Sequence, residues 1–178
     1  VAVTDANGDA ESWDYDALGR TVSHTDGEGF ETTYRHDAAG NVVSETSPRG
    51  GVTEYVYDAM NRATSVTNAE GETTELEYDA AGNVTSSTDP AGIVTRFTYD
   101  PRGLLTRTVE NAVGDVDADA DTNVSTSVAY DARGAVVSTT DPRGGATEHV
   151  LDALARVVET TDAAGRVTGS EYDAAGRL

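Results

Sequence analysis

The feature that most constrains this chain is a short phrase that recurs at a fixed interval. The phrase is Tyr-Asp-x-x-Gly-Arg/Asn; its aspartate occurs eight times, at six intervals of 21 residues and one of 31. These aspartates are Asp16, Asp37, Asp58, Asp79, Asp100, Asp131, Asp152 and Asp173. A fixed period of this size indicates an array of one supersecondary unit, each copy burying its face against its neighbours. An active site needs unlike residues that converge on one point, so the array favours a structural role.

Each unit contains two turn signals and two strand signals. In the unit that starts at Asp79, the first turn is 79–82 and the second is 89–92, each with Asp first and Gly fourth. Asp at the first position accepts backbone hydrogen bonds, and Gly at the fourth takes a positive φ. The runs between the turns are rich in Val, Thr and aromatic residues and have strand length. No run has a helical apolar stripe. The sequence therefore predicts an all-β, repetitive antiparallel β-hairpin array.

Alternation along the runs predicts two unlike faces. The regular face is expected to carry Thr53, Tyr55 and Tyr57 in the second strand of one unit, and Val136, Ser138 and Thr140 in the first strand of another. The other face carries more charge, as at Glu54. The regular face is too rich in Thr, Ser and Tyr for a dense aliphatic core. This composition suits part of a curved sheet that lines a hollow better than a tight sandwich.

The repeat register runs without a boundary over residues 1–178 and predicts one continuous strip. The strip begins part-way through a unit and stops within a turn, so we expect a fragment of a larger protein. A 42-residue double unit would equal one four-stranded blade, which makes a β-propeller the rival fold. Odd and even units look alike, and this similarity argues against blades.

Composition excludes several functions. The net charge is −20 and all twelve basic residues are Arg, so the chain should repel phosphate backbones and bind no nucleic acid. The absence of cysteine excludes disulfides, zinc–thiolate sites and thiol catalysis. No apolar run approaches the length of a membrane-spanning segment.

The motif as a whole resembles a known family. Tyr-Asp-x-x-Gly-Arg followed by Val-x-Ser-x-Thr-Asp-Pro-x-Gly-x-x-Thr-x-x-x-Tyr is similar to the YD repeat of the RHS family, and the resemblance covers essentially the whole chain. The residues that carry it are Tyr15, Asp16, Gly19, Tyr57, Asp58, Tyr78, Asp79, Gly82, Tyr99, Asp100, Gly103, Tyr130, Asp131, Gly134, Tyr172, Asp173 and Gly176. The family includes bacterial polymorphic toxins, toxin-complex subunits and teneurins. Below, the turn that starts at the motif aspartate is called the YD turn.

The resemblance implies a sheet that spirals into a hollow shell around a C-terminal toxin domain or part of the protein itself. It implies a structural, non-enzymatic segment of a secreted or cell-surface protein. The expected partners are neighbouring repeats, an enclosed toxin domain or a second copy. The alternative function is an adhesive or filament-forming cell-surface repeat protein that binds carbohydrate or cells.

Several units depart from the motif. His36 and Leu151 replace the tyrosine, and Asn61 and Ala155 replace the glycine. Leu104 and Ala135 replace the final Arg/Asn. Because Ala tolerates positive φ poorly, we expect another turn type at Ala155. The signature that closes many family shells, and the aspartates linked there to self-cleavage, are not evident. The segment is therefore predicted to be shell wall.

Few residues suggest chemistry. The three histidines, His24, His36 and His149, show no metal-ligand spacing. The serines recur at one repeat position, so they are interpreted as structural. Trp13, the only tryptophan, is interpreted as a packed or edge-covering aromatic, with carbohydrate stacking as the alternative. We predict no catalytic residue.

The one irregular segment is an acidic insertion at 110–123. Ten extra residues enter between Asp100 and Asp131, in the second turn of that unit. Alternate carboxylates there resemble the opening of an Asp-x-Asp-x-Asp calcium loop. The candidate ligands are Asp115, Asp117, Asp119 and Asp121. A glycine at the sixth position and a glutamate at the twelfth are missing, so we expect weak Ca²⁺ binding or, alternatively, a solvated acidic loop. No other cofactor is predicted.

Overall fold

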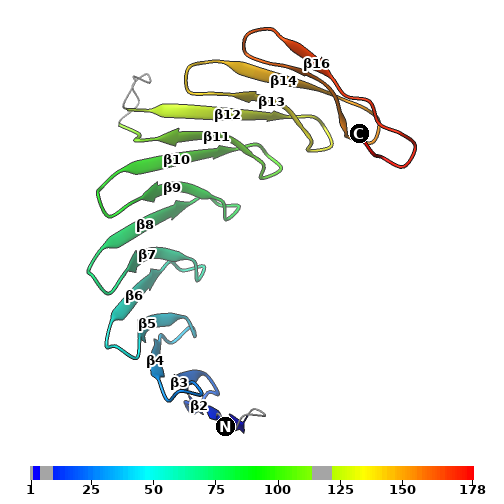
Figure 1. Cartoon of the computed structure of the whole chain (residues 1–178). Helices are drawn as coiled ribbons and strands as arrows, with labels where there is room; N and C mark the ends of the chain where they lie inside the picture. The colour runs from blue at the N-terminus through cyan, green and yellow to red at the C-terminus, as the bar shows by residue number, and fades with distance from the viewer. Residues whose placement is uncertain (1, 5–9, 114–121) are drawn as a thin grey trace. The chain divides into compact units, whose positions relative to one another are not determined.

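The computed structural model describes residues 2–4, 10–113 and 122–178, which form sixteen strands and no helix (Figure 1). The strands are β1 (Ala2–Thr4), β2 (Ala10–Tyr15), β3 (Thr21–Thr25), β4 (Glu31–His36), β5 (Val42–Thr46), β6 (Val52–Tyr57), β7 (Ala63–Thr67), β8 (Thr73–Tyr78), β9 (Val84–Thr88), β10 (Val94–Tyr99), β11 (Leu105–Glu110), β12 (Val124–Tyr130), β13 (Val136–Thr140), β14 (Ala146–Leu151), β15 (Val157–Thr161) and β16 (Val167–Gly169). Two strands therefore form per unit, as the turn spacing predicts.

The strands form one open sheet in which spatial order follows sequence order. This topology confirms the predicted antiparallel hairpin array. It excludes a propeller, whose blades would be separate four-stranded sheets. Among the described residues, no helix is long and apolar enough to cross a membrane.

The chain separates into two compact units: Val1–Glu77 with Thr88–Ala91, and Tyr78–Ser87 with Gly92–Leu178. Tight turns join the consecutive strands from β2 to β11 and from β12 to β16, and within each unit successive connections alternate between the two edges of the sheet (Figure 1). All YD turns of a unit consequently lie in one row along the strand ends on the same side of the sheet. This row is called here the YD edge. The second turns lie on the opposite edge.

The hairpins closed by YD turns contain a bulge. In the pair β6–β7, Tyr57 lies opposite Ala63 while Val56 lies opposite Ser65, so one extra residue enters β7. The same shift occurs in the YD hairpins β2–β3, β4–β5, β10–β11, β12–β13 and β14–β15. No shift occurs in β5–β6, which a second turn joins. Because a bulge bends a strand and increases its twist, the two hairpins of a repeat differ in local geometry.

The bulge corrects one expectation about the faces. Val136, Ser138 and Thr140 were expected to share the regular face. Val136 lies opposite Tyr130 and does belong to that face, but Ser138 lies opposite Glu148, on the charged face. Directly opposed residues share a face, and the extra residue breaks the two-residue alternation between Val136 and Ser138.

The second strands alternate as expected, but neither face forms a dense core. In β6, Thr53 and Tyr55 are half-buried whereas Glu54 and Val56 are exposed. Among the described residues the only buried hydrophobic is Ala112, and no large side chain is fully buried. Backbone pairing and half-buried cross-strand contacts therefore stabilise a sheet one layer thick.

The base of the acidic insertion is closed by hydrogen bonds. Asn123, which is only 5% exposed, donates its backbone N–H to the carbonyl of Asn111 at 2.9 Å. Its side-chain Oδ1 accepts from the N–H of Val113 at 3.0 Å. The N–H of Ala112 donates to the carbonyl of Val94 at 2.8 Å. These bonds satisfy the backbone where β11 ends and β12 begins, independently of the residues between them.

We expect Asn123→Gly to lower the free energy of unfolding by about 1–2 kcal/mol, because a buried hydrogen-bonded amide is removed. Asn123 has a φ of 51°, which Gly adopts without strain, so the loss comes from the missing side chain and from the greater freedom of glycine in the unfolded chain. Asn123→Ala adds backbone strain and should be less stable still. Urea unfolding measures both variants; a Gly variant as stable as the parent would show that the amide does not hold the loop base.

Candidate functional site

The repeated YD turn concentrates the polar interactions of the structure. In the first copy, the N–H of Asp16 donates to the carbonyl of Arg20 at 2.9 Å and the N–H of Gly19 to the carbonyl of Asp16 at 3.0 Å. The Oδ1 atom of Asp16 accepts from the N–H groups of Leu18 and Arg20, at 2.9 and 3.0 Å. Gly19 has a φ of 78°. One carboxylate oxygen thus satisfies two backbone donors of the reversal.

The second carboxylate oxygen binds the side chain at the fifth position of the turn. Arg20 donates its Nε to Asp16 Oδ2 at 2.7 Å, and its Nη2 lies 2.6 Å from the same oxygen. Where the fifth residue is Asn, as at Asn41, its Nδ2 donates to Asp37 Oδ2 at 2.9 Å. The Arg/Asn alternative in the motif therefore has one physical basis, a donor that reaches the free oxygen.

Two units lack that donor, and another residue replaces it. Leu104 and Ala135 occupy the fifth position, but Arg102 and Arg133 stand two residues earlier. Arg102 donates its Nε to Asp100 Oδ2 at 2.9 Å, and Arg133 donates its Nε to Asp131 Oδ2 at 3.1 Å. Sequence inspection missed this compensation. The signal was present as Asp-x-Arg-Gly in the two units whose fifth residue is apolar.

The turn at Ala155 was expected to be of another type, and this expectation is wrong. Ala155 has a φ of 62° and donates its N–H to the carbonyl of Asp152 at 3.0 Å, as glycine does in the other turns. Arg156 binds Asp152 Oδ2 through its Nε at 2.7 Å. The carboxylate contacts hold alanine in a conformation that costs about 1–2 kcal/mol. Asn61 takes the same conformation, with a φ of 62°.

Some YD-turn side chains also reach the next repeat. Arg20 donates its Nη1 to the carbonyl of Asp37 at 2.7 Å, and Asn41 donates to Asn61 Oδ1 at 2.9 Å. In the second unit, Arg102 donates its Nη1 to the carbonyl of Asp131 at 2.9 Å. These bonds join successive turns along the YD edge within each unit.

The motif tyrosines form a second link between repeats. The hydroxyl of Tyr57 donates to the carbonyl of Val42, the first residue of β5, at 2.9 Å. The equivalent bonds are Tyr99 to Val84 at 2.9 Å, Tyr130 to Leu105 at 2.8 Å and Tyr172 to Val157 at 3.0 Å. Tyr130 reaches 25 residues back and the others 15, because the ten inserted residues lie between Leu105 and Tyr130. The motif tyrosine therefore fixes one hairpin to the preceding one.

The predicted motif residues that the structure describes share these roles. The turn bond from the fourth residue to the aspartate carbonyl occurs at Asp16, Asp58, Asp79, Asp100, Asp131 and Asp173, and it is donated by Gly at Gly19, Gly82, Gly103, Gly134 and Gly176. Tyr15 differs from the other tyrosines that begin the motif in its burial: it is 48% exposed, whereas they are half-buried. Tyr78 ends β8.

The same contacts lower the pKa of the turn carboxyls below the ordinary value of 3.8. For Asp16 the largest cause is the backbone N–H of Arg20, followed by its guanidinium. For Asp58 the largest cause is the hydrogen bond from the Arg62 side chain. Each group binds a proton less readily in the folded chain than in the unfolded one. Its stabilisation is therefore present above the unfolded pKa and is lost as pH falls through the folded pKa.

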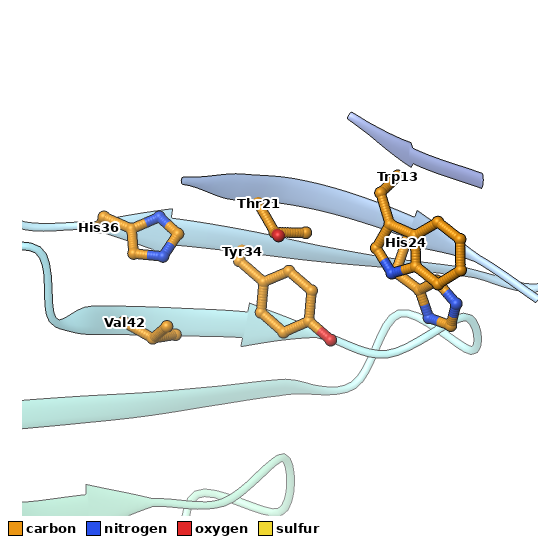
Figure 2. Close-up of a pocket in the computed structure, with 6 residues that line it drawn as sticks. All are labelled: Trp13, Thr21, His24, Tyr34, His36 and Val42. Atoms are coloured by element: carbon orange, nitrogen blue, oxygen red, sulfur yellow. The ribbon is translucent and has the colours of Figure 1, made fainter. Parts of the chain in front are cut away.

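One open hollow lies in the first unit and has a volume of about 290 Å³. Figure 2 shows Trp13 and His24 at one end, His36 and Val42 at the other, and Tyr34 between them. The rings of Trp13 and His24 stack with centroids 4.9 Å apart. His24 Nε2 and His36 Nδ1 are buried and make no hydrogen bond. Trp13 thus packs against a neighbouring ring, consistent with the packed-aromatic interpretation.

Chemistry beyond this network is sparse in the part of the chain that the structure describes. It contains no group of three or more His, Asp or Glu side chains placed to hold a metal ion. The candidate calcium ligands Asp115, Asp117, Asp119 and Asp121 lie outside the described residues. Calcium binding there stays a prediction. The arrangement of the described residues repeats one turn chemistry from unit to unit.

A family model described as RHS Repeat matches residues 1–31, 15–52, 36–73, 78–116 and 152–178. No curated protein sequence matches the chain. Solved structures resemble it over 99% of its length: TcdB2-TccC3-TEV with TM-score 0.61 and 17% identity, TcdB2-TccC3-Cdc42 with 0.56 and 16%, and the Photorhabdus luminescens Tc holotoxin pore with 0.54 and 15%. The chain spans 12%, 11% and 12% of those chains. At these identities the likeness concerns the fold.

We expect Tyr57→Phe to lower the free energy of unfolding by about 1 kcal/mol, because the carbonyl of Val42 loses its hydroxyl donor. Tyr55→Phe is the matched control, since Tyr55 lies on the same face of β6 and its hydroxyl donates to no backbone carbonyl of the described residues. Conversely, Leu151→Tyr should stabilise by providing a donor to Val136. Equal effects of the two Phe variants in urea unfolding would contradict the inter-repeat role.

The lowered pKa values predict how stability depends on pH. The parent chain should lose stability as pH falls below about 4, where the turn carboxyls begin to bind protons. Asp58→Asn should be less stable than the parent at pH 7, and the difference should shrink towards pH 3. Urea midpoints between pH 7 and pH 3 test this trend. A difference that stays constant would show that ionised Asp58 does not stabilise the turn.

Proposed function

We propose that this chain, which belongs to the RHS repeat family, forms part of the wall of a β-sheet shell in a larger exported protein, and that the shell encloses or displays a toxin or effector domain. The observation that carries the proposal is the repetition of one turn chemistry from unit to unit, together with the lack, among the described residues, of a group of His, Asp or Glu side chains placed to hold a metal ion. Such a surface separates two spaces and catalyses nothing itself.

The thinness of the sheet supports a wall. A β-sheet normally buries one face against another layer, yet here the regular face is only half-buried and both faces carry exposed side chains. A large shell provides this arrangement, because its interior face bounds a space. The structural neighbours include components of a Tc holotoxin pore, and the chain matches only 12% of that neighbour's length. This likeness supports a repeat role inside a larger assembly.

Protease protection in the full-length protein tests enclosure. Segments that lie inside the shell should resist a protease that cleaves the same segments after the protein is unfolded. Leu76→Pro removes a ladder N–H from the interior strand β8 and should expose the enclosed segment. Ala69→Pro is the matched control: Ala69 is the second residue of a second turn, where Pro48 and Pro90 occur naturally. Its protection should equal that of the parent.

Two results would contradict the proposal. If no segment of the parent protein is protected, the array encloses nothing, and the adhesive or filament-forming alternative becomes the better interpretation. If the full-length protein keeps its protected segment after Leu76→Pro breaks the sheet, the array is not the protecting wall. Retained folding of the variant outside β8 is checked by circular dichroism.

A further inference from the structure

The units were expected to look alike, but the third residue of the YD turn alternates in size. It is large in the odd units, at Leu18, Met60, Arg102 and Leu154, and small in the even units at Ala39, Ala81 and Ala175. Arg133 is the one exception, and it binds the Asp131 carboxylate. The second turns alternate with the same period, because Pro48, Pro90 and Pro142 all belong to even units. Two independent positions thus show a period of two units.

The large residues of this alternation project from the YD edge. Leu18 is 77% exposed, Met60 is 66% exposed and Leu154 is 74% exposed. Isolated exposed apolar residues are normal, but these recur at equivalent positions. In the first unit, Leu18 and Met60 are separated by four strands, or about 19 Å along the edge, with the small Ala39 midway. The edge therefore presents a projection, a gap and a projection.

The YD edge also carries less net charge than the rest of this acidic chain. Six of the eight YD aspartates form an ion pair with an arginine of their own turn. On the opposite edge, a pair of this kind joins Arg166 and Asp162. Two chains of net charge −20 repel each other, so this edge, where arginine neutralises most of the turn carboxylates, is where they approach at least cost.

We propose that the YD edge of the first unit docks against the same edge of a second copy of this chain. In a two-fold arrangement, Met60 of each copy lies over Ala39 of the other, a self-complementary contact. Only an array with the same strand spacing places its small turn residues opposite the large turn residues of this chain at more than one turn. A second copy of the chain meets this requirement, and an unrelated partner does not. The inference is independent of whether a shell encloses an effector.

Sedimentation equilibrium of the 178-residue chain tests the proposal. The chain should form dimers whose affinity rises with salt, because salt screens the net repulsion. Met60→Ala removes the projection from both copies and should weaken dimers about tenfold or more. Alanine occupies this turn position in other units, so the fold is retained. Val52→Thr with Val56→Thr is the matched control, since it removes two exposed apolar side chains from the sheet face and should leave the affinity unchanged.

Ala39→Leu separates specific docking from general stickiness. Leucine is compatible with this turn position, as Leu18 and Leu154 show. Filling the gap should weaken dimers by removing the space that receives Met60, whereas non-specific hydrophobic association would strengthen. A chain that stays monomeric throughout its soluble range, or dimers strengthened by Ala39→Leu, would overturn the inference. Equal weakening by the Val control and the Met60 variant would place the interface elsewhere.

Discussion

A backbone that reverses direction about every ten residues leaves N–H groups at each reversal that the strand ladder cannot satisfy. At each YD turn of this chain a single carboxylate provides the acceptors. The Oδ1 atom of Asp16 binds two backbone N–H groups, while Oδ2 binds the guanidinium of Arg20. Because the carboxylate satisfies the turn locally, consecutive strands pair without help from a hydrophobic core. The one-layer sheet depends on this interaction being repeated in almost every unit.

Local satisfaction explains how the array tolerates irregular units. Ala155 takes a positive φ because the Asp152 contacts hold it there, and Arg102 replaces the missing donor where Leu104 stands. The ten-residue insertion is accommodated in the same way, since Asn123 closes its base. Each unit interacts chiefly with its neighbours, so stability approximates a sum of unit and nearest-neighbour contributions, and a local defect stays local.

The strands, their order and the turn positions could be predicted because turn chemistry and spacing are local properties of the sequence. The face that carries Ser138 could not, since a bulge depends on how two strands pair and not on either strand alone. The turn at Ala155 was misjudged because φ preference was weighed without the carboxylate contacts of Asp152. The tyrosine hydroxyl bonds also escaped prediction, since they join residues 15 positions apart.

The YD edge and the two faces of the sheet therefore carry different kinds of interaction. Along the YD edge, arginine and aspartate neutralise each other and join successive turns, whereas exposed carboxylates such as Glu54 lie on one face. On the other face, motif tyrosines such as Tyr57 fix each hairpin to the previous one by a hydrogen bond to a backbone carbonyl. This bond does not depend on the side chain of the residue that accepts it. Outward-pointing residues on faces and turns are consequently free to vary without loss of the array. A sheet that is stabilised by its backbone and turns can carry almost any side chains on its two faces.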